Sequence, residues 1–127
     1  MKEPLYSDRT PVSLEENLKK ALTEFLILAL LAERERYIGE LTPEIEARSG
    51  GAIHIEFPYS AIYRISRAGY ITECKKRIAP DGRLRQYYCI TEAGSAYLGE
   101  LEQIYHRFIS GVFRVLQKEA ESDESCS

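Results

Sequence analysis

A cluster of cationic side chains between Arg64 and Arg85 is the sequence feature most suited to chemistry. This segment holds seven cations and two acidic residues, a net charge of +5, so the rest of the chain carries −8 of the total −3. Such side chains bind phosphate oxygens, and arginine also bonds the guanine edge. A basic segment on an acidic chain is typical of a protein that contacts a polyanion with one face.

Other reactive side chains are sparse. The only histidines, His54 and His106, have no nearby ligand set, and the three cysteines, Cys74, Cys89 and Cys126, are too few for a disulfide framework. There is no glycine-rich phosphate loop, and no spacing pairs a nucleophile with a base. We therefore expect no catalytic residue, no cofactor and no metal site, and a reducing, cytoplasmic location without a membrane span.

The first part of the basic segment is predicted to be a helix from Pro58 to Ala68. At 100° per residue its apolar side chains share one face and its polar side chains share the opposite face. The polar face suits a DNA major groove; the alternative is an ordinary solvated helix face. The predicted DNA-facing residues are Ser60, Tyr63, Arg64 and Arg67, with Tyr59 at the edge.

The second part is predicted to be a β-hairpin with strands 70–78 and 84–90. Asp81-Gly82 favours a two-residue turn, which would place Cys74 opposite Cys89, although two reduced thiols are expected there. Like charges around such a turn repel unless a polyanion neutralises them. The alternative is a charged edge that prevents aggregation. The cations expected to hold the DNA backbone are Lys75, Lys76, Arg77, Arg83 and Arg85.

The preceding elements place this segment in a fold. Residues 1–12 read as an arm, and Ser13 with Glu16 forms a capping box that starts the first helix. A shorter helix with Pro43 in its first turn follows, and then a short strand from Ile53 to Phe57. The order predicts a mainly α fold with a small β-hairpin, a winged helix-turn-helix domain over residues 13–91.

A long helix is predicted over residues 92–117, capped by Thr91 and followed by a disordered acidic tail, 118–127. Its apolar residues recur in a heptad-like seam. One small domain cannot cover a helix of this length, so we predict a C-terminal dimerisation helix. The alternative is a helix folded back on its own domain. The predicted dimer interface comprises Leu22, Phe25, Leu26, Leu98, Leu101, Tyr105, Phe108, Val112 and Val115.

Several segments resemble PadR-type transcriptional regulators, most of all Arg85–Gly94 (RQYYCITEAG), and also Leu26–Ala32, Tyr37–Leu41 and Arg67–Ile71. The similarity covers about residues 22–100. It implies a homodimeric winged-helix repressor that binds double-stranded DNA at a palindromic operator and is released by a small aromatic effector. The implied walls of the effector pocket are Phe25, Tyr97, Tyr105 and Phe108.

The chain departs from the family pattern just before the predicted recognition helix. Small residues are usual there, whereas this chain has Glu56-Phe57-Pro58. A glutamate facing DNA would repel phosphate. The alternative function is therefore a winged-helix protein-interaction module that does not bind DNA.

Overall fold

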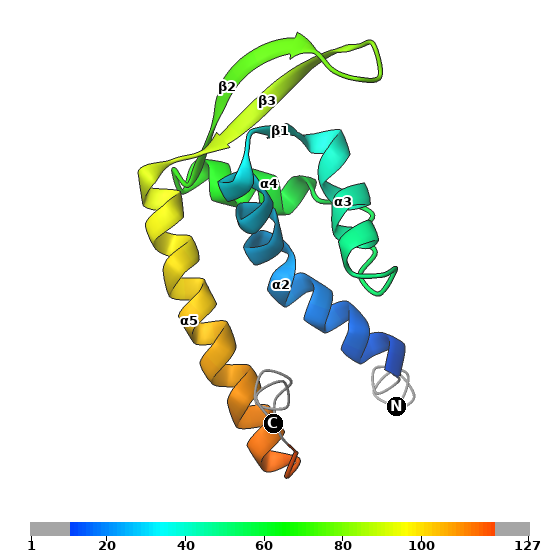
Figure 1. The fold of residues 1–127 in the computed structure, drawn as a ribbon, viewed down its shortest axis with the longest axis vertical. Helices are drawn as coiled ribbons and strands as arrows, with labels where there is room; N and C mark the ends of the chain where they lie inside the picture. Colours follow the sequence, from blue (N-terminus) through cyan, green and yellow to red (C-terminus); the bar gives the residue numbers. More distant parts are fainter. Residues whose placement is uncertain (1–10, 119–127) are drawn as a thin grey trace, which may run out of the picture.

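The structure, a computed structural model, describes residues 11–118 as four α-helices and a small antiparallel sheet (Figure 1). The strand order is β1-β3-β2. The predicted mainly α fold with a hairpin wing and a long last helix is confirmed. The elements are α2 (Pro11–Glu33), β1 (Arg36–Tyr37), the 3-10 helix η1 (Ile38–Glu40), α3 (Leu41–Arg48), α4 (Tyr59–Arg67), β2 (Ile71–Ile78), β3 (Leu84–Ile90) and α5 (Glu92–Val115).

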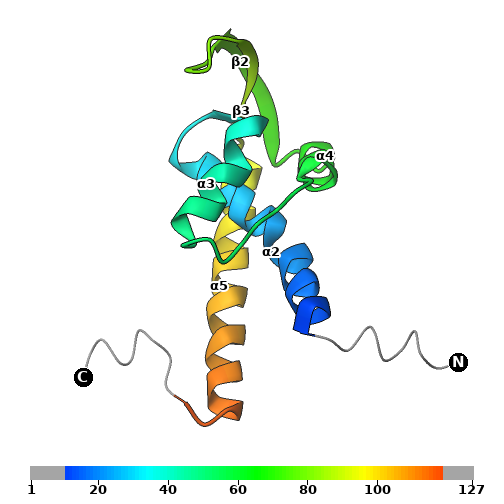
Figure 2. The ribbon, with the colours of Figure 1, turned by 90° about the vertical axis from the view of Figure 1, so that its right-hand side faces the viewer.

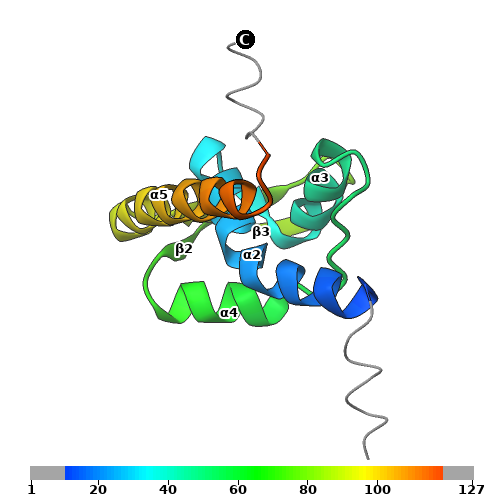
Figure 3. The same cartoon turned by 90° about the horizontal axis from the view of Figure 1, so that it is seen from below.

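The core forms where α2 passes between the other helices (Figure 3). Ile27 and Leu28 are fully buried on α2, and α4 contributes Ile62 and Ile65 from its apolar face. Burial of each such side chain stabilises the fold by about 1.5–3 kcal/mol. This packing fixes the orientation of α4 and leaves its polar face to solvent.

The first helix begins earlier than predicted. α2 already includes Pro11, so Ser13 lies inside the helix and is not its N-cap. Pro11 suits the first turn of the helix because proline has no N–H group that would need a hydrogen-bond partner there. Residues 1–10 and 119–127 lie outside the described part of the chain, as do most of the predicted arm and tail.

The predicted strand from Ile53 to Phe57 is absent, and a different segment completes the sheet. Arg36 and Tyr37 form β1 and pair with Tyr88 and Tyr87 of β3. Residues 53–57 form irregular chain that buries Ile55 but leaves Phe57 78% exposed. The alternating apolar residues of this segment are typical of a strand. The edge of β3 that such a strand could pair with, however, is occupied by β1.

Two local signals fix the ends of α4 and α5 as predicted. Gly69 has φ +84°, and the Tyr70 N–H bonds the Ile65 carbonyl at 2.9 Å, which closes α4 in a Schellman motif. The Thr91 hydroxyl accepts the Gly94 N–H at 3.0 Å and caps α5. It also donates to the Gly69 carbonyl at 2.7 Å, so the two helix ends are joined.

The hairpin turn differs from the predicted two-residue loop. Pro80-Asp81-Gly82 form a three-residue loop in which the Gly82 N–H bonds the Ala79 carbonyl and Gly82 adopts φ +84°. A β-bulge between Glu73 and Lys75 then shifts the register again. Thr72, and not Cys74, is therefore the partner of Cys89, so the predicted cross-strand cysteine pair is wrong.

α5 extends well past the body of the fold. Its first half packs on α2, and its second half projects away from the sheet (Figures 1 and 2). Twenty-four residues correspond to about 36 Å of helix. Within residues 11–118, none of the helices combines the length and the hydrophobicity that a membrane crossing requires.

Candidate nucleic-acid interface

The two faces of α4 differ as the helix wheel predicts. Ala61, Ile62 and Ile65 are at most 6% exposed, whereas Tyr59 and Tyr63 are about 60% exposed. The remaining predicted residues of the polar face, Ser60, Arg64 and Arg67, are exposed as well. The helix therefore presents a surface of hydroxyl, phenol and guanidinium groups, all of which bond phosphate or base edges.

Arg64 is not the free side chain that the sequence predicts. Its Nε donates a hydrogen bond to Glu24 Oε2 of α2 at 2.5 Å. The packing of α4 against α2 brings the two side chains together, a proximity that the wheel of one helix does not reveal. The Arg64 side chain remains 56% exposed. An exposed pair of this kind is worth at most about 1 kcal/mol, so a stronger anionic partner can displace Glu24.

Arg67 is ordered by its own helix. Its Nη1 donates to the Tyr63 hydroxyl at 2.6 Å, and its guanidinium lies 5.5 Å from the centre of the Tyr63 ring. These contacts hold the two predicted DNA-facing side chains together on the solvent side. Neither contact neutralises the arginine, because the phenol is uncharged.

The wing cations divide between two faces of the hairpin. Figure 2 shows the hairpin rising beside α4 and curving over the body, so that one of its faces is turned toward the body and the other faces outward. On the inner face Lys75 and Arg77 both pair with Glu35, at 3.5 Å and 2.6 Å. Arg85, directly opposite Arg77, pairs with Asp81 at 2.6 Å. The like-charge repulsion expected among the five wing cations is therefore offset within the chain for these three.

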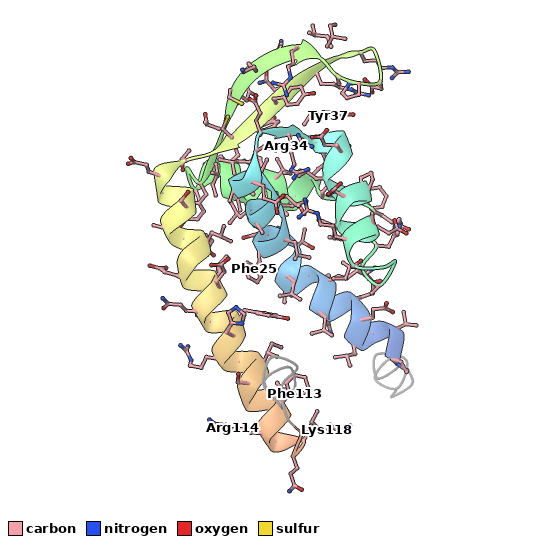
Figure 4. The ribbon with its side chains drawn as sticks, in the orientation of Figure 1. Phe25, Arg34, Tyr37, Phe113, Arg114 and Lys118 are labelled. Atoms are coloured by element: carbon pink, nitrogen blue, oxygen red, sulfur yellow. The ribbon has the colours of Figure 1, made fainter. Side chains whose placement is uncertain are left out.

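Aromatic rings fix the same inner-face arginines. The Arg77 guanidinium lies 3.9 Å above the centre of the buried Tyr87 ring, and that of Arg85 lies 5.1 Å from the Tyr37 ring. The cation–π contacts and the ion pairs together hold the Arg77 and Arg85 side chains against the inner face of the wing. Figure 4 shows Tyr37 below the hairpin, with Arg34 nearby.

Two wing cations keep no ion pair with a described residue, namely Lys76 and Arg83. Lys76 lies opposite Gln86, on the face away from the body because it alternates with Lys75 and Arg77. Ile78 and Leu84, opposite each other on the same face, are 64% and 62% exposed. The outer face of the wing thus combines a cation with an apolar pair.

Glu35 is a functional candidate that sequence reasoning missed. A hydrogen bond from Cys74, then one from Arg77, lowers the pKa of this carboxyl to about 2. Packing around the Cys74 sulfur, together with the adjacent Cys89 thiol and the Glu35 carboxylate, raises the pKa of the Cys74 thiol to about 12, although the residue is exposed overall. No sequence signal marks Glu35, since it lies in a polar break far from the hairpin.

The predicted dimer residues fall into two groups. Leu98 is 8% exposed and belongs to the core of its own chain, so little of its side chain is left for a second copy to contact. Five are half-buried, namely Leu22, Phe25, Leu26, Leu101 and Tyr105. Phe25 and Tyr105 meet between α2 and α5, whereas Leu26 lies beside Ile45 and Arg48 of α3. Further along α5, Phe108, Val112 and Val115 are 71%, 40% and 81% exposed. Only this second group is a fully uncovered apolar stripe.

The four predicted effector-pocket residues do not enclose a common cavity within one chain. Phe25 packs against Tyr105, with ring centres 5.5 Å apart, and Tyr97 stacks on Tyr70 at 4.3 Å. Figure 4 shows Phe25 on α2 beside α5. Phe108 alone of the four is mostly exposed.

Comparisons with known proteins give a consistent result. The family model described as the transcriptional regulator PadR-like family matches residues 27–100. An uncharacterised protein of Lysinibacillus sphaericus is 35% identical over 77 residues, which are 60% of this chain and 71% of that protein.

Solved structures share the fold. A PadR family transcriptional regulator from Eggerthella lenta DSM 2243 superimposes with a TM-score of 0.71 at 24% identity, over 88% of this chain and 96% of the other. A PadR-like transcriptional regulator from Bacillus cereus strain ATCC 14579 gives 0.68 at 24% identity, over 81% and 99%.

Proposed function

Because this chain belongs to the PadR-like family of transcriptional regulators, we propose that it binds specific double-stranded DNA sequences as a homodimer and represses transcription in the cytoplasm. The observation that carries this proposal is the exposed polar face of α4 next to the wing. Membership of the family supports a DNA-binding regulator. That this chain acts as a homodimer, recognises specific sequences and represses transcription is our own proposal.

The proposed contacts follow from which side chains face outward. Ser60, Tyr63 and Arg67 of α4 enter the major groove, and Arg64 joins them when phosphate or a base replaces Glu24. Lys76 and Arg83 of the wing contact the sugar-phosphate backbone. Tyr59 lies at the N-terminal edge of α4. The paired cations Lys75, Arg77 and Arg85 add to the local positive potential without direct contact.

The exposed stripe of α5 supports the homodimer. Phe108, Val112 and Val115 form an apolar surface that a second copy of the helix would cover. A twofold dimer would present two α4 helices to successive major grooves, which requires a palindromic operator. Sedimentation of the wild type and of Phe108→Asp tests this: we expect a dimer and a monomer respectively. A wild type that sediments as a monomer would contradict the homodimer.

The same region supports the proposed effector site. Phe25 and Tyr105 pair between α2 and α5, and the exposed Phe108 follows Tyr105 by three residues on the same helix, so these rings could stack on a small aromatic molecule bound there.

The direct experiment for DNA binding is an electrophoretic mobility shift of the purified full chain on the DNA upstream of its own gene, at several salt concentrations. We expect affinity to fall steeply with salt, because each neutralised phosphate contributes about 0.9 to the slope of log K against log salt. A flat response would contradict the proposed contacts.

One observation favours the alternative, a protein-interaction module. Phe57 is 78% exposed next to the start of α4, and Glu56 beside it carries a negative charge. An exposed aromatic residue at this place fits an apolar partner better than a phosphate backbone. Substitution Phe57→Ser decides between the two functions, since it should leave DNA affinity unchanged under our proposal and abolish partner binding under the alternative.

A further inference from the structure

Three metal-ligating side chains meet at the base of the wing. They are the thiols of Cys74 on β2 and Cys89 on β3, and the carboxylate of Glu35 between α2 and β1. One ligand atom from each lies within 4.8 Å of the other two. Glu35 Oε1 is 3.1 Å from the Cys74 sulfur and 4.0 Å from the Cys89 sulfur.

These separations match the edges of a tetrahedral zinc site. Zinc–sulfur bonds of about 2.3 Å and zinc–oxygen bonds of about 2.0–2.2 Å place sulfur and oxygen ligands roughly 3.5 Å apart. The two observed sulfur–oxygen distances lie on either side of that value, so small side-chain movements suffice to bind an ion. We propose that Cys74, Cys89 and Glu35 bind one Zn²⁺ ion, with a fourth position open to water.

The backbone aims Cys74 into this cluster. Successive residues of a strand normally point to opposite faces of a sheet. Cys74 lies two residues from Thr72, the partner of Cys89, and therefore shares the face of Cys89. The β-bulge between Glu73 and Lys75 then brings Lys75 to that face as well, so that Cys74 and Lys75 both contact Glu35. A bulge redirects a side chain in this way next to many functional sites. Without it, Lys75 would point away from Glu35.

The surrounding charges suit a bound cation. Arg77 and Lys75 contact Oε2 of Glu35, whereas both thiols lie nearest Oε1, so one carboxylate oxygen remains for the ion. Two thiolates, one carboxylate and Zn²⁺ together carry a single negative charge. The two adjacent cations offset it and hold the carboxylate in place, as outer-shell partners of metal ligands commonly do. Binding forms two zinc–sulfur bonds and releases the two thiol protons, without oxidation.

The test is a titration of the reduced full chain with Co²⁺, an optical probe for zinc sites, in the Cys126→Ser background. This background removes the remaining thiol, which lies outside the described residues. We expect one Co²⁺ per chain, a thiolate-to-cobalt charge-transfer band, and complete displacement by one equivalent of Zn²⁺. Absence of the band would overturn the proposal.

Matched variants locate the site. Cys74→Ser and Cys89→Ser should each weaken Co²⁺ binding at least tenfold, and Glu35→Gln should do the same while leaving both thiols in place. Circular dichroism shows whether each variant folds, and Glu73→Gln, on the bulge but outside the cluster, should bind like the parent. A band that survives the cysteine variants, or reduced protein that binds no Co²⁺ but forms a Cys74–Cys89 disulfide in air, would contradict a metal site.

Discussion

Glu24 and Arg64 join α2 to the polar face of α4 through a hydrogen bond of 2.5 Å between Glu24 Oε2 and Arg64 Nε. The pair occupies an arginine that would otherwise be free to contact DNA. Under the proposed function, Glu24 would compete with DNA for the guanidinium, because both are anionic acceptors.

Substitution Glu24→Gln is therefore expected to strengthen DNA binding. Loss of the ion pair frees Arg64, and an exposed pair of about 1 kcal/mol corresponds to a gain in affinity of up to about fivefold. Fluorescence anisotropy with labelled DNA measures the change. Glu15→Gln is the control, since Glu15 is an exposed α2 residue without an ion pair among the described residues. Equal gains in the two variants would show that general charge, not Arg64, is responsible.

The division of wing cations predicts different effects for two neighbouring residues. Lys76→Ala should reduce the slope of log K against log salt by about 0.9, because Lys76 faces outward and is proposed to contact a phosphate. Arg77→Ala should change the slope less, because Arg77 is already paired with Glu35. The measurement is DNA affinity at four or more salt concentrations. Similar slopes for both variants would contradict the assignment of the two faces.

Alanine substitution at two glycines of α5 should change the free energy of unfolding in opposite directions. A Cβ at Gly94 would lie 2.1 Å from the Tyr70 carbonyl oxygen, whereas a Cβ at Gly99 meets nothing within 4 Å. Gly94→Ala should cost about 1–3 kcal/mol or more of unfolding free energy, and Gly99→Ala should add about 0.5–1 kcal/mol. Urea denaturation at fixed protein concentration measures both. A stable Gly94→Ala protein would show that α5 does not approach Tyr70 so closely.

Protonation of Glu33 is expected to lower the free energy of unfolding in acid. Two hydrogen bonds from Arg48, with a further one from Arg36, lower the pKa of the Glu33 carboxyl from 4.5 to about 2. Since the folded state holds the carboxylate ionised, its contribution is complete above pH 4.5 and disappears as the pH falls toward 2. Urea midpoints between pH 5 and pH 2.5 should fall less in Glu33→Gln than in the wild type. Parallel curves would exclude Glu33 as a source of the acid sensitivity.

Local sequence signals account for the elements that were predicted correctly. Gly69 and Thr91 mark the ends of helices because their backbone and hydroxyl preferences act within a few residues. The faces of α4 follow from periodicity alone. The order of the helices and the hairpin was also predicted from residue patterns, and the family model over residues 27–100 confirms the resemblance to the PadR-like family.

Apart from the start of α2 and the length of the hairpin loop, which are local, the errors involve partners distant in sequence. Residues 53–57 alternate like a strand, but only the fold shows that β1 takes the available edge. The bulge at Cys74 and the pairing of Glu24 with Arg64 depend on register and helix packing. Glu35, which neutralises part of the wing, lies 39 or more residues from its partners there.

Selection of random double-stranded DNA by the purified full chain, followed by sequencing, tests the central claim most directly. The account predicts enrichment of an inverted repeat whose half-sites lie about one helical turn apart. It also predicts that Arg67→Ala alters the preferred bases, whereas Arg114→Ala, at the far end of α5 (Figure 4), leaves them unchanged. Failure to enrich any sequence at low salt, with folded dimeric protein, would contradict a DNA-binding role for α4 and the wing.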